Sequence, residues 1–186
     1  DTVTITAKGA APVTESEGVI ITVALGNTSD DTGTIEITNR DTVPVDIAGW
    51  RLCGYQGGNR YSSNLFSSGT VLQPGDQIQV NWNQTGSNSG NVYFTGNICG
   101  SDWGSISLYA PSSVGGFGSA VAVRAYLQWE VNAAGRSDES AGGDEWAYCD
   151  DVVDISAFSS GSTICLGSGD ETFAASFSED STPTLG

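Results

Sequence analysis

Residues 35–54 read IEITNRDTVPVDIAGWRLCG, and their order indicates the fold more clearly than any other stretch of the chain. Ile35 and Ile37 alternate with polar neighbours, which predicts a strand with one apolar face. Trp50 and Leu52 alternate in the same way after a short interruption. We therefore expect two strands that send these four side chains into one core.

The residues between the two strands predict turns. Residues 39–42, Asn-Arg-Asp-Thr, are typical of a polar turn. Asp46 is a candidate acid for chemistry, but its place before Ala48 and Gly49 favours capping of backbone amides at a bend. We interpret this aspartate as structural.

Similar short apolar runs follow along the chain, separated by Gly, Ser, Asn and Asp turns. In the segment LQPGDQIQV, Pro74 and Gly75 predict a type II turn before the next strand. Many short strands with such turns predict an all-β chain arranged as a β-sandwich. The strands that we expect cover residues 2–8, 19–25, 34–38, 43–47, 50–53, 70–72, 77–81, 91–94, 105–109, 120–129, 152–155, 162–166 and 171–177.

These motifs together resemble those of the lamin-tail domain, an immunoglobulin-like β-sandwich also found in secreted bacterial proteins. The similar segments are the opening stretch, VLQPGDQIQV at 71–80, SISLYAP at 105–111, AYLQWEVNAAGR at 125–136 and EDSTPTLG at 179–186. The resemblance spans about residues 19–186 and implies an interaction or surface module rather than an enzyme. It does not extend to the cysteines or to residues 1–17.

The chain therefore divides into two parts by sequence. Residues 1–17 hold an amphipathic strand, TVTITAK, followed by a Gly/Pro/Glu linker, and residues 18–186 form the lamin-tail-like domain. Val3 and Ile5 lie on the apolar side of that first strand. The strand either completes the sheet of its own molecule or adds to the sheet edge of a neighbour, as in donor-strand complementation.

Composition narrows the class of protein further. The chain of 186 residues has no His, no Met and 25 Gly. A start without Met suggests a processed, secreted chain, and no apolar run approaches the roughly 20 residues of a membrane-spanning helix. Lack of His excludes Ser-His-Asp, Cys-His and His-ligated metal catalysis, and leaves only paired carboxylates of the glycosidase kind. We expect no enzymatic activity and no organic cofactor.

The four cysteines, Cys53, Cys99, Cys149 and Cys165, are widely spaced and form no Cys-x-x-Cys pair. An even number in a secreted chain predicts two disulfides rather than a zinc site. Three connectivities are possible. We favour Cys53 with Cys99 and Cys149 with Cys165, because the second pair could bridge neighbouring strands.

The net charge of −16 argues against nucleic acid and anionic membranes as partners. Hard oxygen ligands on Gly/Ser loops suit calcium, although no EF-hand spacing is present and a solvated acidic surface is the alternative. The candidate ligands are Asp30, Asp31, Asp138, Glu139, Asp144, Glu145, Asp150 and Asp151.

Two functions follow as hypotheses. The first is an extracellular structural protein that forms a filament or surface assembly as a homopolymer, through Val3 and Ile5 of each subunit. The second is a monomeric surface module for adhesion or carbohydrate binding. Aromatic residues near loops are its candidate glycan contacts, although packing at the core edge is favoured for them: Tyr55, Tyr61, Trp82, Tyr93 and Trp103.

Overall fold

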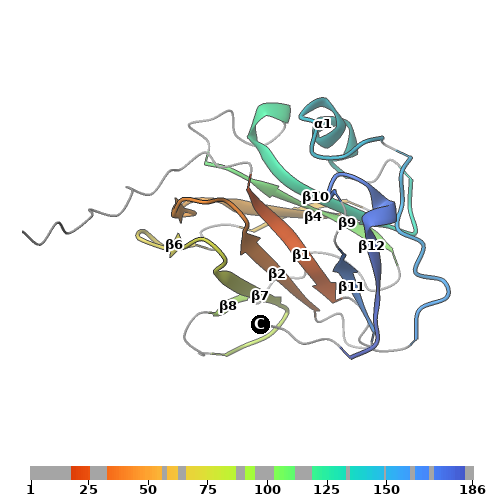
Figure 1. Ribbon diagram of the computed structural model, residues 1–186, viewed down its shortest axis with the longest axis horizontal. Coiled ribbons are helices and arrows are strands. Elements are labelled where there is room, and N and C mark those ends of the chain that lie inside the picture. The colour runs from red at the N-terminus through yellow and green to blue at the C-terminus, as the bar shows by residue number, and fades with distance from the viewer. Residues whose placement is uncertain are drawn as a thin grey trace, which may run out of the picture.

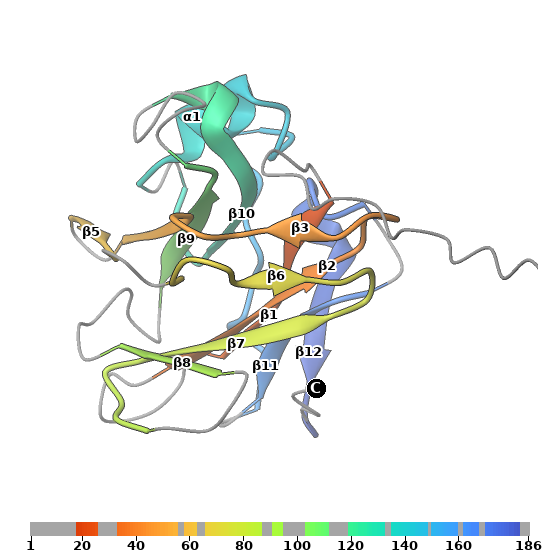
Figure 2. The ribbon, with the colours of Figure 1, turned by 90° about the vertical axis from the view of Figure 1, so that its left-hand side faces the viewer.

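The computed structural model describes residues 18–25, 33–55, 58–62, 66–86, 91–94, 103–111, 119–132, 135–148, 150–159, 162–167 and 170–182. This part of the chain is mostly β and contains two larger sheets and one small one (Figures 1 and 2). The prediction of an all-β chain is therefore confirmed. The predicted first strand, with Val3 and Ile5, lies outside the described residues.

The larger sheet has six strands in the order β12-β11-β1-β2-β7-β8. All its pairings are antiparallel except that of β7 with β8, which is parallel. Its strands are β1 (Val19–Leu25), β2 (Gly33–Asn39), β7 (Gln77–Trp82), β8 (Asn91–Phe94), β11 (Thr163–Leu166) and β12 (Phe177–Asp180).

The second sheet has four antiparallel strands in the order β10-β9-β4-β5. They are β4 (Arg51–Tyr55), β5 (Asn59–Tyr61), β9 (Gly104–Tyr109) and β10 (Val123–Trp129). A two-stranded sheet pairs β3 (Val45–Asp46) with β6 (Val71–Leu72). Three short helices complete the described elements: η2 (Ala120–Ala122), α1 (Ser137–Gly142) and η3 (Ala174–Ser176).

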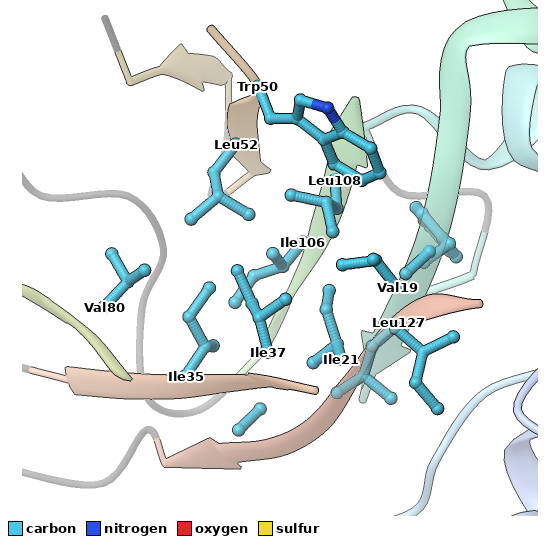
Figure 3. Close-up of a cluster of buried hydrophobic side chains, with 14 of the residues drawn as sticks. Val19, Ile21, Ile35, Ile37, Trp50, Leu52, Val80, Ile106, Leu108 and Leu127 are labelled. Atoms are coloured by element: carbon cyan, nitrogen blue, oxygen red, sulfur yellow. The ribbon is translucent and has the colours of Figure 1, made fainter. Parts of the chain in front are cut away.

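One hydrophobic core lies between the two larger sheets (Figure 3). Ile35 and Ile37 of β2 point toward Leu52 and Ile106 of the four-stranded sheet, as the alternation in the sequence predicts. These side chains are fully buried. Burial of each such side chain contributes roughly 1.5–3 kcal/mol, so this shared core is what holds the sheets together.

The opposite face of β2 is polar and nevertheless buried. Thr34, Glu36 and Thr38 alternate with the core residues and lie on the outer face of the six-stranded sheet. Glu36 is only 3% exposed. Buried polar groups need hydrogen-bond partners, and neighbouring strands supply them here.

Two predicted turns are confirmed. Asp46 Oδ1 accepts a hydrogen bond from Ala48 N at 2.9 Å, and Gly49 follows with a φ of 78°. At the second turn Gly75 has a φ of 84°, while Asp76 N donates to Gln73 O at 2.9 Å. Positive φ favours glycine at both positions, which explains why Gly49 and Gly75 occur in these turns.

The main differences from the predicted strands fall in the last third of the chain. Residues 137–142 form α1, which was not predicted, and residues 152–155 contribute only a bridge between Val153 and Trp129. The predicted strand at 171–177 is also misplaced, because β12 begins at Phe177 after the turn of η3. Strand β5 was not predicted at all.

Candidate functional site

Most of the predicted calcium ligands lie in a segment that covers the edge strand β10. This acidic segment, residues 130–154, contains α1 and a series of turns. Figure 1 shows α1 beside the start of β10, next to η2. Val153 pairs in parallel with Trp129, so the segment also closes part of the open side of β10.

Trp146 fills the seam where the edges of the two larger sheets approach each other. Its ring contacts Tyr126 of β10 edge-to-face at a centroid distance of 5.4 Å, and Phe177 of β12 at 6.1 Å. The side chain is 1% exposed. An indole of this size in contact with both sheets makes a large contribution to the shared core.

Asp151 holds this arrangement in place through several hydrogen bonds. Its backbone oxygen accepts from Gln128 Nε2 at 2.6 Å and from Trp146 Nε1 at 2.9 Å. Its carboxylate accepts from Ala174 N at 2.7 Å. Tyr126 completes the network by donating to Gln128 Oε1 at 2.9 Å. We call Tyr126, Gln128, Trp146, Asp151 and Phe177 the seam cluster.

Glu139 also has a structural partner. Its Oε1 lies 2.6 Å from the Arg136 guanidinium, three residues earlier, on the inner side of α1. Burial lowers the pKa of Arg136, but the hydrogen bonds that its guanidinium donates to Glu139 and Cys53 outweigh this effect and raise the pKa above its ordinary value. Burial, with a smaller effect of Glu139, raises the pKa of Tyr109 on the same face. This ion pair anchors α1 on the four-stranded sheet.

The remaining acids of the segment are dispersed. Asp138, Asp144 and Asp150 are exposed, whereas Glu145 is buried. Among the described residues no three acidic or cysteine side chains are grouped in a way that could hold a metal ion. Asp30 and Asp31 lie outside those residues. Glu139 and Asp151 have structural hydrogen-bond partners that account for their positions. Calcium binding stays a prediction.

Two of the four cysteines can be placed. Cys53 lies on the outer face of the four-stranded sheet, beside Tyr109, and its Sγ is 3.9 Å from Gly54 O. Cys165 lies on β11, where burial and the Asp180 carboxylate raise the pKa of its thiol. A bond between these two does not fit, because a disulfide needs Cα atoms within about 7 Å and they lie on different sheets.

Cys99 and Cys149 lie outside the described residues, so the predicted pairing of Cys53 with Cys99 and of Cys149 with Cys165 remains a prediction. Within the described part of the chain Cys165 has no disulfide partner. Its thiol lies 3.7 Å from Thr163 Oγ1 and 3.8 Å from Asp180 Oδ2. Of the three possible connectivities, the structure argues against the one that joins Cys53 to Cys165.

The loop aromatics divide into two groups. Trp82 was a candidate glycan contact, but it is 1% exposed and packs in the core against Gly33. Tyr55 and Trp103 are half-buried and meet edge-to-face at 6.2 Å, and Tyr93 is half-buried as well. The side chain of Tyr61 lies outside the described residues. These positions fit packing at the edge of the core better than a binding platform.

Two exposed aromatic residues in the described part of the chain were not among the sequence-based candidates. Tyr148 is 66% exposed and Phe173 is 43% exposed. Their backbone segments are joined by a hydrogen bond of 2.8 Å from Ala147 N to Thr172 O. The sequence does not predict this exposure, because both residues lie in irregular segments. Such segments lack the regular alternation of apolar and polar residues that distinguishes buried from exposed positions.

The two sheets differ in how their edges end. The outer side of β10 meets the bridge at Val153, whereas β12 and β8 meet no further strand within the described residues. Among the side chains of β12, Phe177 enters the core while Ser178 and Glu179 are exposed. An edge strand of this kind presents backbone groups to which another strand can add.

Comparison with known proteins gives no assignment. Neither a protein-family model nor a curated protein sequence matches the chain. None of the described helices has the length and apolar character needed to cross a membrane. The function therefore has to be argued from the geometry alone.

Proposed function

We propose that this protein is a secreted, non-enzymatic structural subunit that assembles with copies of itself outside the cell. In this proposal residues 18–186 form an immunoglobulin-like β-sandwich of the lamin-tail type. Residues 1–17 supply an extra strand, and Val3 and Ile5 enter the sheet of the neighbouring subunit. The observation that supports it best is the edge strand β12, beyond which no described strand follows in the six-stranded sheet.

The contrast with β10 favours β12 as the receiving strand. At β10 the backbone bridge between Trp129 and Val153 already occupies part of the edge. At β12 the exposed side chains are small or polar, and Phe177 closes the core beneath them. Addition of a strand to such an edge uses main-chain hydrogen bonds for affinity and alternate side chains for register. A head-to-tail contact of this kind does not close and so builds a filament.

The experiment that tests this function compares the full chain with a chain lacking residues 1–9. We expect the full chain to form filaments in negative-stain images and the shortened chain to remain a folded monomer by size-exclusion chromatography and circular dichroism. The same assembly by the shortened chain would contradict strand donation. A monomeric full chain at all concentrations would contradict the whole proposal.

Two further parts of the proposal concern stability outside the cell. Two disulfides would lock the subunit, and calcium would neutralise part of a net charge of −16. Thermal unfolding with calcium, with magnesium and with a chelator tests the second part. An increase of the melting temperature with calcium alone is the expected result, and equal curves in all three conditions would remove calcium from the proposal.

A second candidate function is supported by the exposure of Tyr148 and Phe173. Exposed aromatic rings with a carboxylate nearby in sequence, here Asp150, suit carbohydrate binding, because sugars stack on rings and donate hydrogen bonds to carboxylates. Affinity electrophoresis against a panel of polysaccharides tests this function. Retardation that is lost in Tyr148→Ala but kept in Val121→Ala would favour it, since Val121 is also exposed but lies in η2.

A further inference from the structure

Four polar side chains on the outer face of the six-stranded sheet form an arrangement that the proposed function does not use. They are Thr22 of β1, Glu36 and Thr38 of β2, and Gln77 of β7. Thr38 and Gln77 lie directly opposite each other in the register of the two strands. Thr22, Glu36 and Thr38 are buried, whereas Gln77 is exposed.

The hydrogen bonds among these groups converge on one carboxylate oxygen. Thr22 Oγ1 donates to Glu36 Oε1 at 3.0 Å and lies 2.8 Å from Thr38 Oγ1. Gln77 Nε2 donates to the same Glu36 Oε1 at 2.9 Å and lies 3.4 Å from Thr38 Oγ1. Because the Thr22 proton points to Glu36, the Thr38 hydroxyl is the donor in the bond between the two threonines.

This geometry contains the parts that acyl transfer requires. Thr38 is a hydroxyl nucleophile beside the Gln77 amide, and its proton has a path through Thr22 to Glu36. The Glu36 oxygen that receives the proton is already hydrogen-bonded to the nitrogen that must leave. Neighbouring strands hold the two reacting groups together, which replaces a bimolecular encounter by a reaction within the chain. A reaction that occurs once per molecule needs no fast turnover.

We propose that Thr38 and Gln77 become joined by an intramolecular ester bond, with Glu36 and Thr22 moving the proton. Thr38 Oγ1 forms a bond to Gln77 Cδ, and the bond between Cδ and Nε2 breaks. The hydroxyl proton passes through Thr22 to Glu36 and then to the departing nitrogen, which leaves as ammonia. No oxidant, metal or second substrate takes part.

The consequence is a covalent link between β2 and β7, two interior strands of the six-stranded sheet. An ester on this face would join the strands without using a cysteine. It would resist separation of these strands in denaturant. This inference does not depend on strand donation by residues 1–17, because every group that it uses lies within one molecule.

The test is the intact mass of the purified protein, followed by tandem mass spectrometry of its peptides. We expect the mass to be lower than the sequence mass by one ammonia, with the peptides that contain Thr38 and Gln77 linked. Hydroxylamine, which cleaves esters, should separate them. A mass equal to the sequence mass, after correction for any disulfides, would overturn the proposal.

Variants separate this reaction from other losses of ammonia. Thr38→Val and Gln77→Glu should each abolish the mass difference, because one lacks the nucleophile and the other the amide. Glu36→Gln should slow the loss of ammonia at least tenfold. The intact mass should therefore be followed over several days after refolding. A folded Glu36→Gln protein that links as fast as the natural sequence would exclude the role of the carboxylate.

A matched control is present on the same strands. Thr34 and Asn81 also lie opposite each other, and Thr34 Oγ1 donates to Asn81 Oδ1 at 2.7 Å. None of the hydrogen bonds described for this pair involves a carboxylate. Thr34→Val should therefore leave the mass difference unchanged. Loss of the difference in Thr34→Val, with folding intact, would show that the deficit arises elsewhere and would overturn the assignment.

Discussion

The edge strands β10 and β12 lie on either side of the same seam, but they differ in what lies on their outer sides. The outer side of β10 is covered by the acidic segment, with a bridge at Val153 and the Trp146 ring against Tyr126. β12 meets no further described strand on its outer side. A protein that avoided all strand addition would be expected to protect both edges. Under the proposed function, the bridged edge serves stability and the edge at β12 receives the partner strand.

The largest effect is expected from removing the ring that closes the seam. Trp146→Ala should lower the free energy of unfolding by about 3–5 kcal/mol, because it leaves a cavity in contact with both sheets. Urea unfolding followed by circular dichroism measures this change. Tyr148→Ala, two residues later but exposed, is the control and should change stability by less than about 0.5 kcal/mol. Equal effects would mean that Trp146 does not join the sheets.

A smaller loss is expected at Asp151. Asp151→Ala removes the acceptor of Ala174 N but keeps the backbone oxygen that binds Gln128 and Trp146. An amide left without its partner costs about 1–3 kcal/mol, and chemical denaturation would show that loss. The loss should be the same with calcium and with a chelator. A difference between those two conditions would instead favour Asp151 as a calcium ligand.

At the open edge we expect an effect on assembly rather than on stability. Ser178→Lys places a charge on an exposed position of β12 and should hinder addition of a strand. Filament length in negative-stain images should fall severalfold while the unfolding midpoint stays nearly constant. The control is Gln73→Lys, at an exposed position directly after β6, which belongs to the separate two-stranded sheet. Assembly by Ser178→Lys at the natural level would show that β12 is not the receiving edge.

The smallest effect concerns pH at the same edge. Hydrogen bonds from Ser162 Oγ and Ser159 N hold the pKa of Glu179 below its ordinary value. The folded state thus favours the ionised form, so this contribution is present at neutral pH and is lost as the pH falls through the lowered folded pKa. Glu179→Gln should flatten the dependence of the unfolding midpoint below about pH 4. An unchanged acid profile would contradict this.

Apart from β5, the described strands in the first two thirds of the chain follow closely from the sequence, and particular residues show why. Ile35 and Ile37 alternate with polar residues, and Gly75 supplies a positive φ where the turn needs one. Strands and turns of this kind are determined by residues that are close in the sequence, so they can be predicted from it. Trp50 is buried as predicted, because it directly precedes β4 and continues the alternation of that strand.

The last third follows less well because its structure depends on contacts with distant strands. Val153 forms a bridge through backbone hydrogen bonds with Gln128 and Glu130, and α1 is held against the sheet by the pair of Arg136 and Glu139. The spacing of apolar residues in the sequence predicts neither of these contacts. The acids at 138–151 were interpreted as candidate ligands, yet Glu139 and Asp151 have structural partners that only the folded chain reveals.

The position of β1 has a consequence for how the chain folds during synthesis. β1 lies between β2, its neighbour in sequence, and β11, where Val23 pairs with Cys165. One side of β1 therefore stays open until almost the whole chain has emerged. Contacts between such distant residues slow folding and expose strands to aggregation in the meantime. We expect ribosome-bound chains that end before β11 to remain incompletely protected from proteases along β1, and protection to appear abruptly once β11 is available.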